Sequence, residues 1–113
     1  MTTHVSLDDK YTRDRGRIFI SGTQALVRLP LIQFERDRAA GLDTAGYITG
    51  YRGSPLAGID QQLHAAQKFY ADKPLVFQPG LNEDLAATAV WGTQQAGLHG
   101  PAKYSGVFAM WYG

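Results

Sequence analysis

Four short runs along the chain are rich in β-branched and aromatic residues, a composition that is typical of β-strands. They cover residues 17–21, 44–51, 74–78 and 104–112. Between these runs, apolar residues recur every three or four positions, which is the spacing of one face of a helix. The pattern therefore predicts strands and helices that alternate along the chain.

Three helices are predicted, over residues 23–40, from Ser54 onward, and over residues 83–96. Gly41 would end the first helix, because glycine readily adopts the left-handed conformation found after a helix end. Ser54 and Asn82 would cap the other two, and Pro55 suits the first helical position. The second helix carries one apolar stripe, made of Ile59, Leu63, Ala66 and Tyr70.

This alternation predicts an α/β fold with a mainly parallel sheet and flanking helices. In such a sheet, every loop from a strand to a helix emerges at the carboxyl edge, where ligands bind. Gly22, residues 52–55 and residues 79–84 form these three loops. We therefore expect any functional site to lie at this edge.

A chain of 113 residues forms one domain, and its 44% apolar residues predict a globular one. Residues 1–16 have charges without periodicity, so we expect a flexible or draped arm ahead of a domain at 17–113. Eleven basic and ten acidic residues give a net charge of +1. This balance argues against a nucleic-acid or membrane partner, which requires clustered basic residues.

The chain has no cysteine, which excludes disulfides, a thiol nucleophile and cysteine-ligated metal clusters within these residues. His4, His64 and His99 are far apart and lack metal-ligand spacing. No secretory signal and no apolar run of roughly 20 residues occurs, so a cytoplasmic protein is expected. The sequence ends at Gly113, directly after an apolar strand, which indicates a fragment of a longer protein.

Glu83 stands at the start of a helix made mostly of Ala, Thr and Gly, and two interpretations are open. An acid in the first turn complements the helix dipole, which is a common structural role. Alternatively, the carboxylate faces a ligand, beside small residues that allow another surface to approach closely. A carboxylate desolvated there would have a raised pKa and could hold or relay a proton.

The loop at residues 50–58 also has two interpretations. It is a glycine-rich turn with a capping serine, or it binds a small anion through Arg52 and the free N–H groups of a helix start. It lacks the lysine and the glycine spacing of nucleotide-binding loops, so a small carboxylate is as plausible as a phosphate. Among the remaining residues, His64 and the charged run at 35–38 are expected at the surface, and Trp91 and Trp111 in packing.

Four segments together resemble the start of the long, fused indolepyruvate:ferredoxin oxidoreductases of bacteria. They are ISGTQALVRLPLIQFERDRAAG, GYRGSPLAGID, FQPGLNEDLAATAVWGTQQ and YSGVFAMWYG, and they occur in the family's order from about Asp9 onward. These enzymes belong to the thiamine-diphosphate-dependent 2-oxoacid:ferredoxin oxidoreductases. The resemblance implies a truncated domain of the type that binds the aminopyrimidine ring of thiamine diphosphate.

The resemblance also implies roles for individual residues. Glu83, with its neighbour Asn82, matches the cofactor-binding pair, in which the glutamate hydrogen-bonds the pyrimidine ring and favours its imino tautomer. Ser54 and Gly53 match the turn that shapes the substrate pocket, and Ser54 would reach the carboxylate of the 2-oxo acid. Arg52 departs from the proline that shorter relatives have there. Gly22, Thr23 and Gln24 match the opening of the family's first helix.

The resemblance implies oxidative decarboxylation of indolepyruvate or related aryl pyruvates to acyl-CoA, with ferredoxin as the electron acceptor. The Gly-Asp-Gly pattern that holds Mg²⁺ and the diphosphate is absent, as are cysteines for iron–sulfur clusters. We therefore expect these groups in other domains, a homo-oligomer, and no activity from this chain alone. The alternative is a stand-alone, flavodoxin-like module that binds a small anion or forms dimers.

Overall fold

The computed structural model describes residues 4–56 and 58–113. Along these residues the elements follow one another as α1 (Asp9–Thr12), α2 (Gly22–Ala39), β1 (Thr44–Gly50), α3 (Gly58–Ala65), the 3-10 turn η1 (Gln67–Phe69), β2 (Leu75–Phe77), α4 (Glu83–Thr93) and β3 (Gly106–Tyr112). Residues 1–3 of the expected arm and Ala57 of the loop at 50–58 lie outside the described residues.

The three strands form one parallel sheet in the order β2–β1–β3, which confirms the predicted α/β class. β3 pairs with β1 along its whole length, from Thr44 opposite Gly106 to Gly50 opposite Tyr112. β2 is short and pairs with the middle of β1 on the other side. β1 is thus the central strand, and the chain crosses it between β2 and β3.

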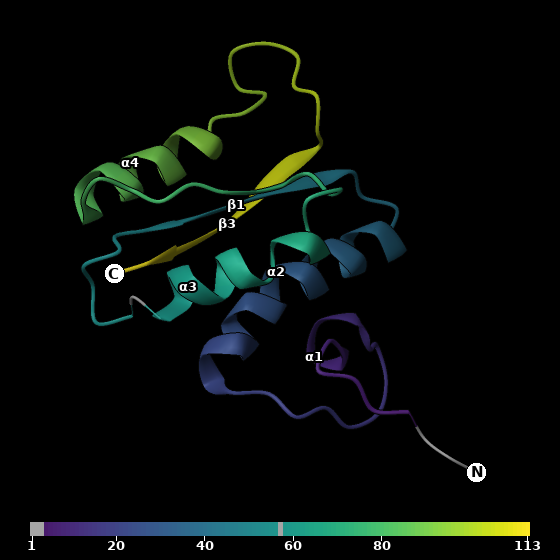
Figure 1. The fold of residues 1–113 in the computed structure, drawn as a ribbon. Helices are drawn as coiled ribbons and strands as arrows, with labels where there is room; N and C mark the ends of the chain where they lie inside the picture. Colours follow the sequence, from purple (N-terminus) through teal and green to yellow (C-terminus); the bar gives the residue numbers. More distant parts are fainter. Residues whose placement is uncertain (1–3, 57) are drawn as a thin grey trace.

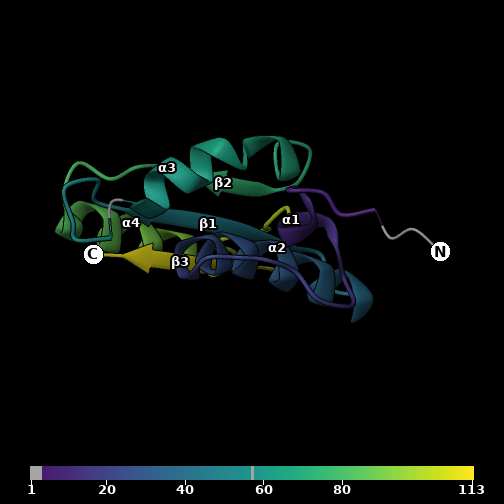
Figure 2. The same ribbon diagram turned by 60° about the horizontal axis from the view of Figure 1, so that its bottom comes forward.

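Helices cover both faces of the sheet, with α4 on one side and α2 and α3 on the other (Figure 1). Figure 2 shows the same layers after rotation, with β2 beneath α3. The core fills the α2 and α3 side, where apolar side chains from both helices meet those of the sheet. Its buried members are Val27, Leu31, Ile48, Ile59, Leu63, Ala66, Tyr70, Leu75 and Tyr112. The burial predicted for the stripe on the second helix is therefore confirmed, but α3 ends at Ala65, so Ala66 and Tyr70 lie beyond the helix, on either side of η1.

The α4 side of the sheet is covered more thinly. Ala86 is the one buried residue of α4, and it lies close above Gly80, where an added Cβ would come within 2.7 Å of the Ala86 Cβ. Our expectation that Trp91 and Trp111 pack inside was wrong, because their exposed fractions are 67% and 46%. This face consequently presents apolar side chains to solvent.

The first predicted strand, at residues 17–21, does not form. Phe19 is 96% exposed, and no neighbouring strand in the described residues lies beside this segment to pair with it. Instead, Ser21 caps α2: its side chain accepts a bond from the Gln24 N–H, and the Gln24 side chain accepts from the Ser21 N–H. This reciprocal capping box fixes the start of the helix at Gly22.

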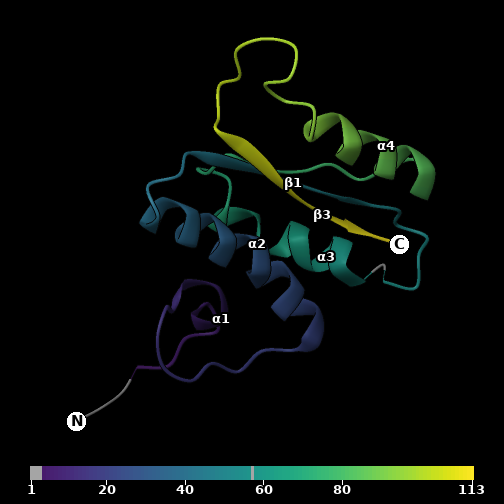
Figure 3. The ribbon, with the colours of Figure 1, turned by 180° about the vertical axis from the view of Figure 1, so that it is seen from behind.

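The described part of the N-terminal segment lies against the outer side of α2 (Figure 3). The Arg28 guanidinium donates to the carbonyl oxygens of Lys10 and Arg13, at 2.7 and 2.6 Å. The Tyr11 ring meets the Phe69 ring with centroids 5.2 Å apart. The arm that we expected therefore includes a one-turn helix, α1, that the sequence pattern did not predict.

The charged run at residues 35–38 is only partly a surface face. Glu35 and Arg36 are exposed as expected, but Asp37 is buried. Its carboxylate accepts bonds from the Gln33 amide and the Thr44 hydroxyl. A buried carboxylate needs such donors to replace water, and here they connect the end of α2 to the start of β1.

Candidate functional site

Two of the three predicted strand-to-helix loops are present at the carboxyl edge of the sheet, after β1 and after β2, whereas Gly22 follows no strand because residues 17–21 do not form one. The start of α2 lies near the start of α3, where a Cβ on Gly58 would lie 3.9 Å from Thr23. The loop after β2 follows the end of β1, with the Gly80 N–H donating to the Gly50 carbonyl at 2.9 Å. In Figure 1 the C-terminus, the start of α4 and the loop into α3 gather at the left edge of the sheet.

Asn82 and Glu83 form the start of α4 as predicted. The Asn82 side chain accepts a hydrogen bond from the Leu85 N–H at 2.8 Å, which satisfies one of the free donors of the first turn. Glu83 is the first helical residue, and a Cβ on Gly113 would lie 3.5 Å from its Cγ. The cap therefore fixes Glu83 beside the end of β3.

The carboxylate of Glu83 has no hydrogen bond or ion pair with any residue that the structure describes. Glu83 is exposed, so this chain does not desolvate it as our second interpretation required. Because no described residue covers the carboxylate, a second surface would be needed to remove water from it.

Ser54 does not cap the second helix, because α3 begins at Gly58. Its side-chain oxygen accepts from the Leu56 N–H at 3.1 Å, which closes a local turn instead. Ser54 is buried, whereas Gly53 is exposed and underlies the Tyr51 ring. A Cβ on Gly53 would come within 2.4 Å of that ring, so the Tyr51 side chain would have to move to admit one.

Arg52 is held by a residue that the sequence analysis did not single out. Its Nε lies 3.4 Å from Oδ2 of Asp60, and Oδ1 of the same carboxylate lies 3.3 Å from Nε2 of His64. The Asp60 side chain is 5% exposed, and that of Arg52 is 69% exposed. His64 is exposed, as expected, and its ring nitrogen contacts the Asp60 carboxylate. The only sequence signal for Asp60 is its place in the first turn of α3, which is common for an acid.

Tyr112 lies beside this group at the end of β3. It is 4% exposed, and its hydroxyl has no hydrogen-bond partner among the described residues. Burial raises the pKa of Tyr112 to about 12, with a further increase from the Asp60 carboxylate and a partial offset from Arg52. The hydroxyl is therefore neutral throughout the physiological pH range.

Replacing Tyr112 by Phe should reduce the loss of stability at alkaline pH. The folded pKa of about 12 exceeds the ordinary value of 10.0. The unfolded chain therefore loses this proton first, and the free energy of unfolding falls as pH rises from 10 toward 12. Below pH 10 the two proteins should differ by about 1 kcal/mol or less, because the hydroxyl has no partner to lose.

Urea unfolding at pH 8 and pH 11 measures this difference. Tyr11 and Tyr70 serve as an internal reference, because burial raises the pKa of each and both remain in the variant. An equal loss of stability in the two proteins between these pH values would contradict the assignment to Tyr112.

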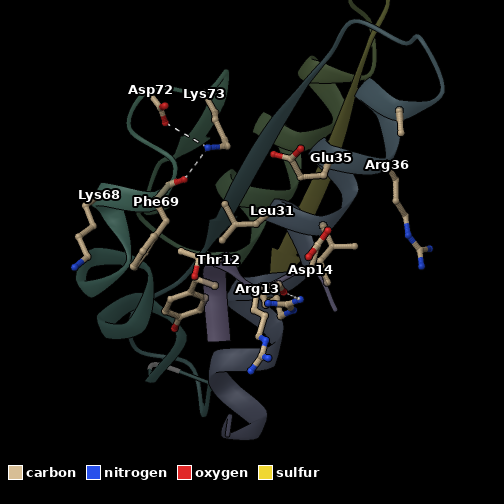
Figure 4. A pocket seen from close by; sticks show the side chains of 14 residues that line it. Thr12, Arg13, Asp14, Leu31, Glu35, Arg36, Lys68, Phe69, Asp72 and Lys73 are labelled. Atoms are coloured by element: carbon tan, nitrogen blue, oxygen red, sulfur yellow. Dashed lines mark hydrogen bonds and ion pairs between the residues drawn. The ribbon is translucent and has the colours of Figure 1, made fainter. Parts of the chain in front are cut away.

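A hollow in the surface lies elsewhere, between the N-terminal segment, α2 and the turn that contains η1 (Figure 4). Its volume is about 920 Å³, and Leu31 and Phe69 lie among charged side chains that include Arg36 and Lys73. It is lined by none of the site residues predicted from the sequence, Arg52, Gly53, Ser54, Asn82 and Glu83. The candidate site is thus an exposed edge rather than an enclosed cavity.

Within residues 4–56 and 58–113, no group of three or more His, Asp or Glu side chains is arranged to hold a metal ion. No helix in this part of the chain is both long and apolar enough to cross a membrane.

The candidate site consists of two groups at one edge: Asn82 and Glu83 at the start of α4, and Arg52, Ser54 and Asp60 around the loop into α3. No protein-family model, curated protein or solved structure matches the chain.

Proposed function

We propose that this chain supplies the pyrimidine-binding half of the cofactor site in a thiamine-diphosphate-dependent 2-oxoacid:ferredoxin oxidoreductase. The observation that carries the proposal is the placement of Glu83. An asparagine cap fixes this carboxylate at the carboxyl edge of a parallel sheet. No described residue forms a hydrogen bond or an ion pair with the carboxylate, so it is free to bind a ligand. The carboxyl edge is the position where α/β folds bind ligands.

The residues of this edge fit the pyrimidine end of the cofactor and not its diphosphate end. A free carboxylate can bond a ring nitrogen, and the adjacent backbone is built from small residues such as Gly80 and Gly113. No described cluster of acids could hold the Mg²⁺ that accompanies a diphosphate. When bound, thiamine diphosphate supplies the electron sink for decarboxylation.

In this proposal, Glu83 holds a proton at its carboxyl oxygen and orients the ring through that hydrogen bond. Holding a proton near neutral pH requires desolvation. Leu81 and Leu85 on either side of Glu83 are exposed apolar residues, so a second domain or subunit that covers them would also exclude water from the carboxylate. This feature supports an oligomeric enzyme in which the half-sites face each other.

In this proposal, the other part of the edge, around the loop into α3, binds the substrate. Arg52, whose side chain is exposed, offers donors to the carboxylate of a 2-oxo acid, with indolepyruvate and related aryl pyruvates as the proposed class, and the buried Ser54 shapes the turn that carries Arg52. Coenzyme A, ferredoxin, Mg²⁺ and the iron–sulfur clusters would be bound by other domains.

The test is to isolate the native assembly that contains this chain with an antibody against it. Immunoblotting gives the size of its polypeptide, and reduction of methyl viologen by phenylpyruvate plus coenzyme A gives its activity. We expect a polypeptide much larger than 12.4 kDa, and a reduction that depends on added thiamine diphosphate after the cofactor is removed. Reduction that never depends on the cofactor, or is absent, would overturn the proposal.

A small-anion-binding module is the second candidate function, and the exposed Arg52 beside a buried carboxylate favours it. A native polypeptide of 12.4 kDa that binds a carboxylate but shows no cofactor-dependent reduction would support this alternative.

A further inference from the structure

We propose that Asp60 is a positioning residue: it holds Arg52 so that the two terminal nitrogens of the guanidinium face a planar carboxylate ligand. The ligand class, a 2-oxo acid, rests on the proposed function, whereas the positioning rests on the geometry alone. Neither the pattern of the sequence nor the resemblance indicated a role for Asp60.

The Asp60 carboxylate is buried. A buried charge is stable only with a cation or several donors beside it, and removing one partner is costly. Arg52 is the cation beside Asp60, with Nε 3.4 Å from Oδ2, and Nε2 of His64 lies 3.3 Å from the other oxygen, Oδ1. The carboxylate is thus tied to the loop after β1 as well as to its own helix.

The orientation of the Arg52 guanidinium follows from its contact with Asp60. Its contact with Asp60 uses Nε, and neither terminal nitrogen has a partner among the described residues. An exposed arginine without an anchor samples many rotamers, and ordering it on binding costs entropy. Because Asp60 anchors Nε, the two terminal nitrogens of the guanidinium are already restricted in position. These two nitrogens can donate two parallel bonds to a carboxylate.

The residues around Arg52 carry little net charge. Arg52 and Asp60 together are neutral, and the Tyr112 hydroxyl beside them is also neutral. Attraction by excess charge is therefore small, and the donor geometry has to provide the binding. Lysine in place of Arg52 would keep the charge and lose the geometry, since one ammonium cannot reproduce the planar fork.

The experiment uses the ¹⁵N-labelled 113-residue chain and phenylpyruvate as the probe. NMR follows the Arg52 Nε–H signal, which is protected from solvent exchange only while Nε is hydrogen-bonded. In the wild type we expect this signal to be visible and to shift on titration. Asp60→Asn should broaden it and weaken phenylpyruvate binding by about tenfold or more, since charge-assisted bonds are the strong ones.

Three further variants make the result specific. Asp60→Glu should restore part of the affinity, because it keeps the carboxylate. Asp84→Asn removes the same charge from an exposed position in the first turn of α4 and should change nothing. Arg52→Lys changes an exposed side chain, so the fold is retained, and should weaken binding by about tenfold as well.

Wild-type affinity in Asp60→Asn or in Arg52→Lys would overturn the positioning role. A wild-type chain in which phenylpyruvate does not shift the Arg52 signal would overturn the carboxylate site itself. Both results are distinct from failure of the proposed function, because this titration needs no thiamine diphosphate and does not involve Glu83.

Discussion

Replacing Glu83 by Gln should lower the thiamine-diphosphate-dependent turnover of the assembled enzyme by a factor of about 10²–10⁴, the usual contribution of a proton-transferring side chain. Glutamine keeps the size and the polarity of the side chain, but its amide cannot exchange a proton with a ring nitrogen. Steady-state reduction of methyl viologen with saturating phenylpyruvate and cofactor measures the effect. We expect it in kcat rather than in the KM for the 2-oxo acid.

The fold should tolerate this change, because Glu83 is exposed and has no partner among the described residues. Asn82→Ala is the matched control at the neighbouring position. It removes the cap of α4 and should cost about 1 kcal/mol of stability, measured by urea unfolding. If Glu83→Gln retains full turnover, or loses as much stability as Asn82→Ala, Glu83 is a structural acid at a helix start and the proposed function is wrong.

Replacing Gly50 by Ala should destabilise the protein by about 1–3 kcal/mol, a large part of the total of about 5–15 kcal/mol for a domain. A Cβ at this position would lie 2.4 Å from the backbone oxygen of Tyr112 and equally close to its ring. The oxygen belongs to the strand paired with Gly50, so a rotamer change cannot remove the clash. The ends of β1 and β3 would have to separate.

Gly106→Ala is the matched control, since Gly106 pairs with Thr44 at the other end of the same two strands. No atom in the part of the chain that the structure describes lies within 4 Å of a Cβ added there. That variant should be as stable as the wild type or more stable by up to about 1 kcal/mol, because alanine restricts the unfolded chain. Thermal and urea unfolding compare the two variants, and equal stabilities would contradict the close approach of β3 to Gly50.

The fold was predictable where local signals and tertiary packing agree. The apolar stripe from Ile59 to Tyr70 and the cap at Asn82 both have a local cause, and both are present. Residues 17–21 have strand composition, but a strand also requires a partner, and the order β2–β1–β3 provides none for them. The capping box of Ser21 and Gln24 is a helix-start signal at the end of this segment, and the structure contains it.

The candidate site was predictable only in part, for a similar reason. The position of Glu83 follows from the start of a helix, which can be located from sequence. The role of Asp60 depends on burial and on contact with Arg52 eight positions earlier, across a loop whose path the sequence does not specify. Ser54 shows the same limit: its hydroxyl caps a turn rather than the helix, because α3 starts later than the Ser-Pro pair indicates.

The pairing of β1 with β3 has a consequence for how the protein is made. Ser105, directly before β3, bonds to Asp43, directly before β1, across a separation of 62 residues. At the usual synthesis rate of about 5–20 residues per second, β3 is synthesised about 3–12 s after β1. During this interval β2 alone can pair with β1, and the opposite edge of β1 stays open. A nascent chain at this stage presents an unpaired strand edge, a feature that makes folding intermediates prone to aggregate.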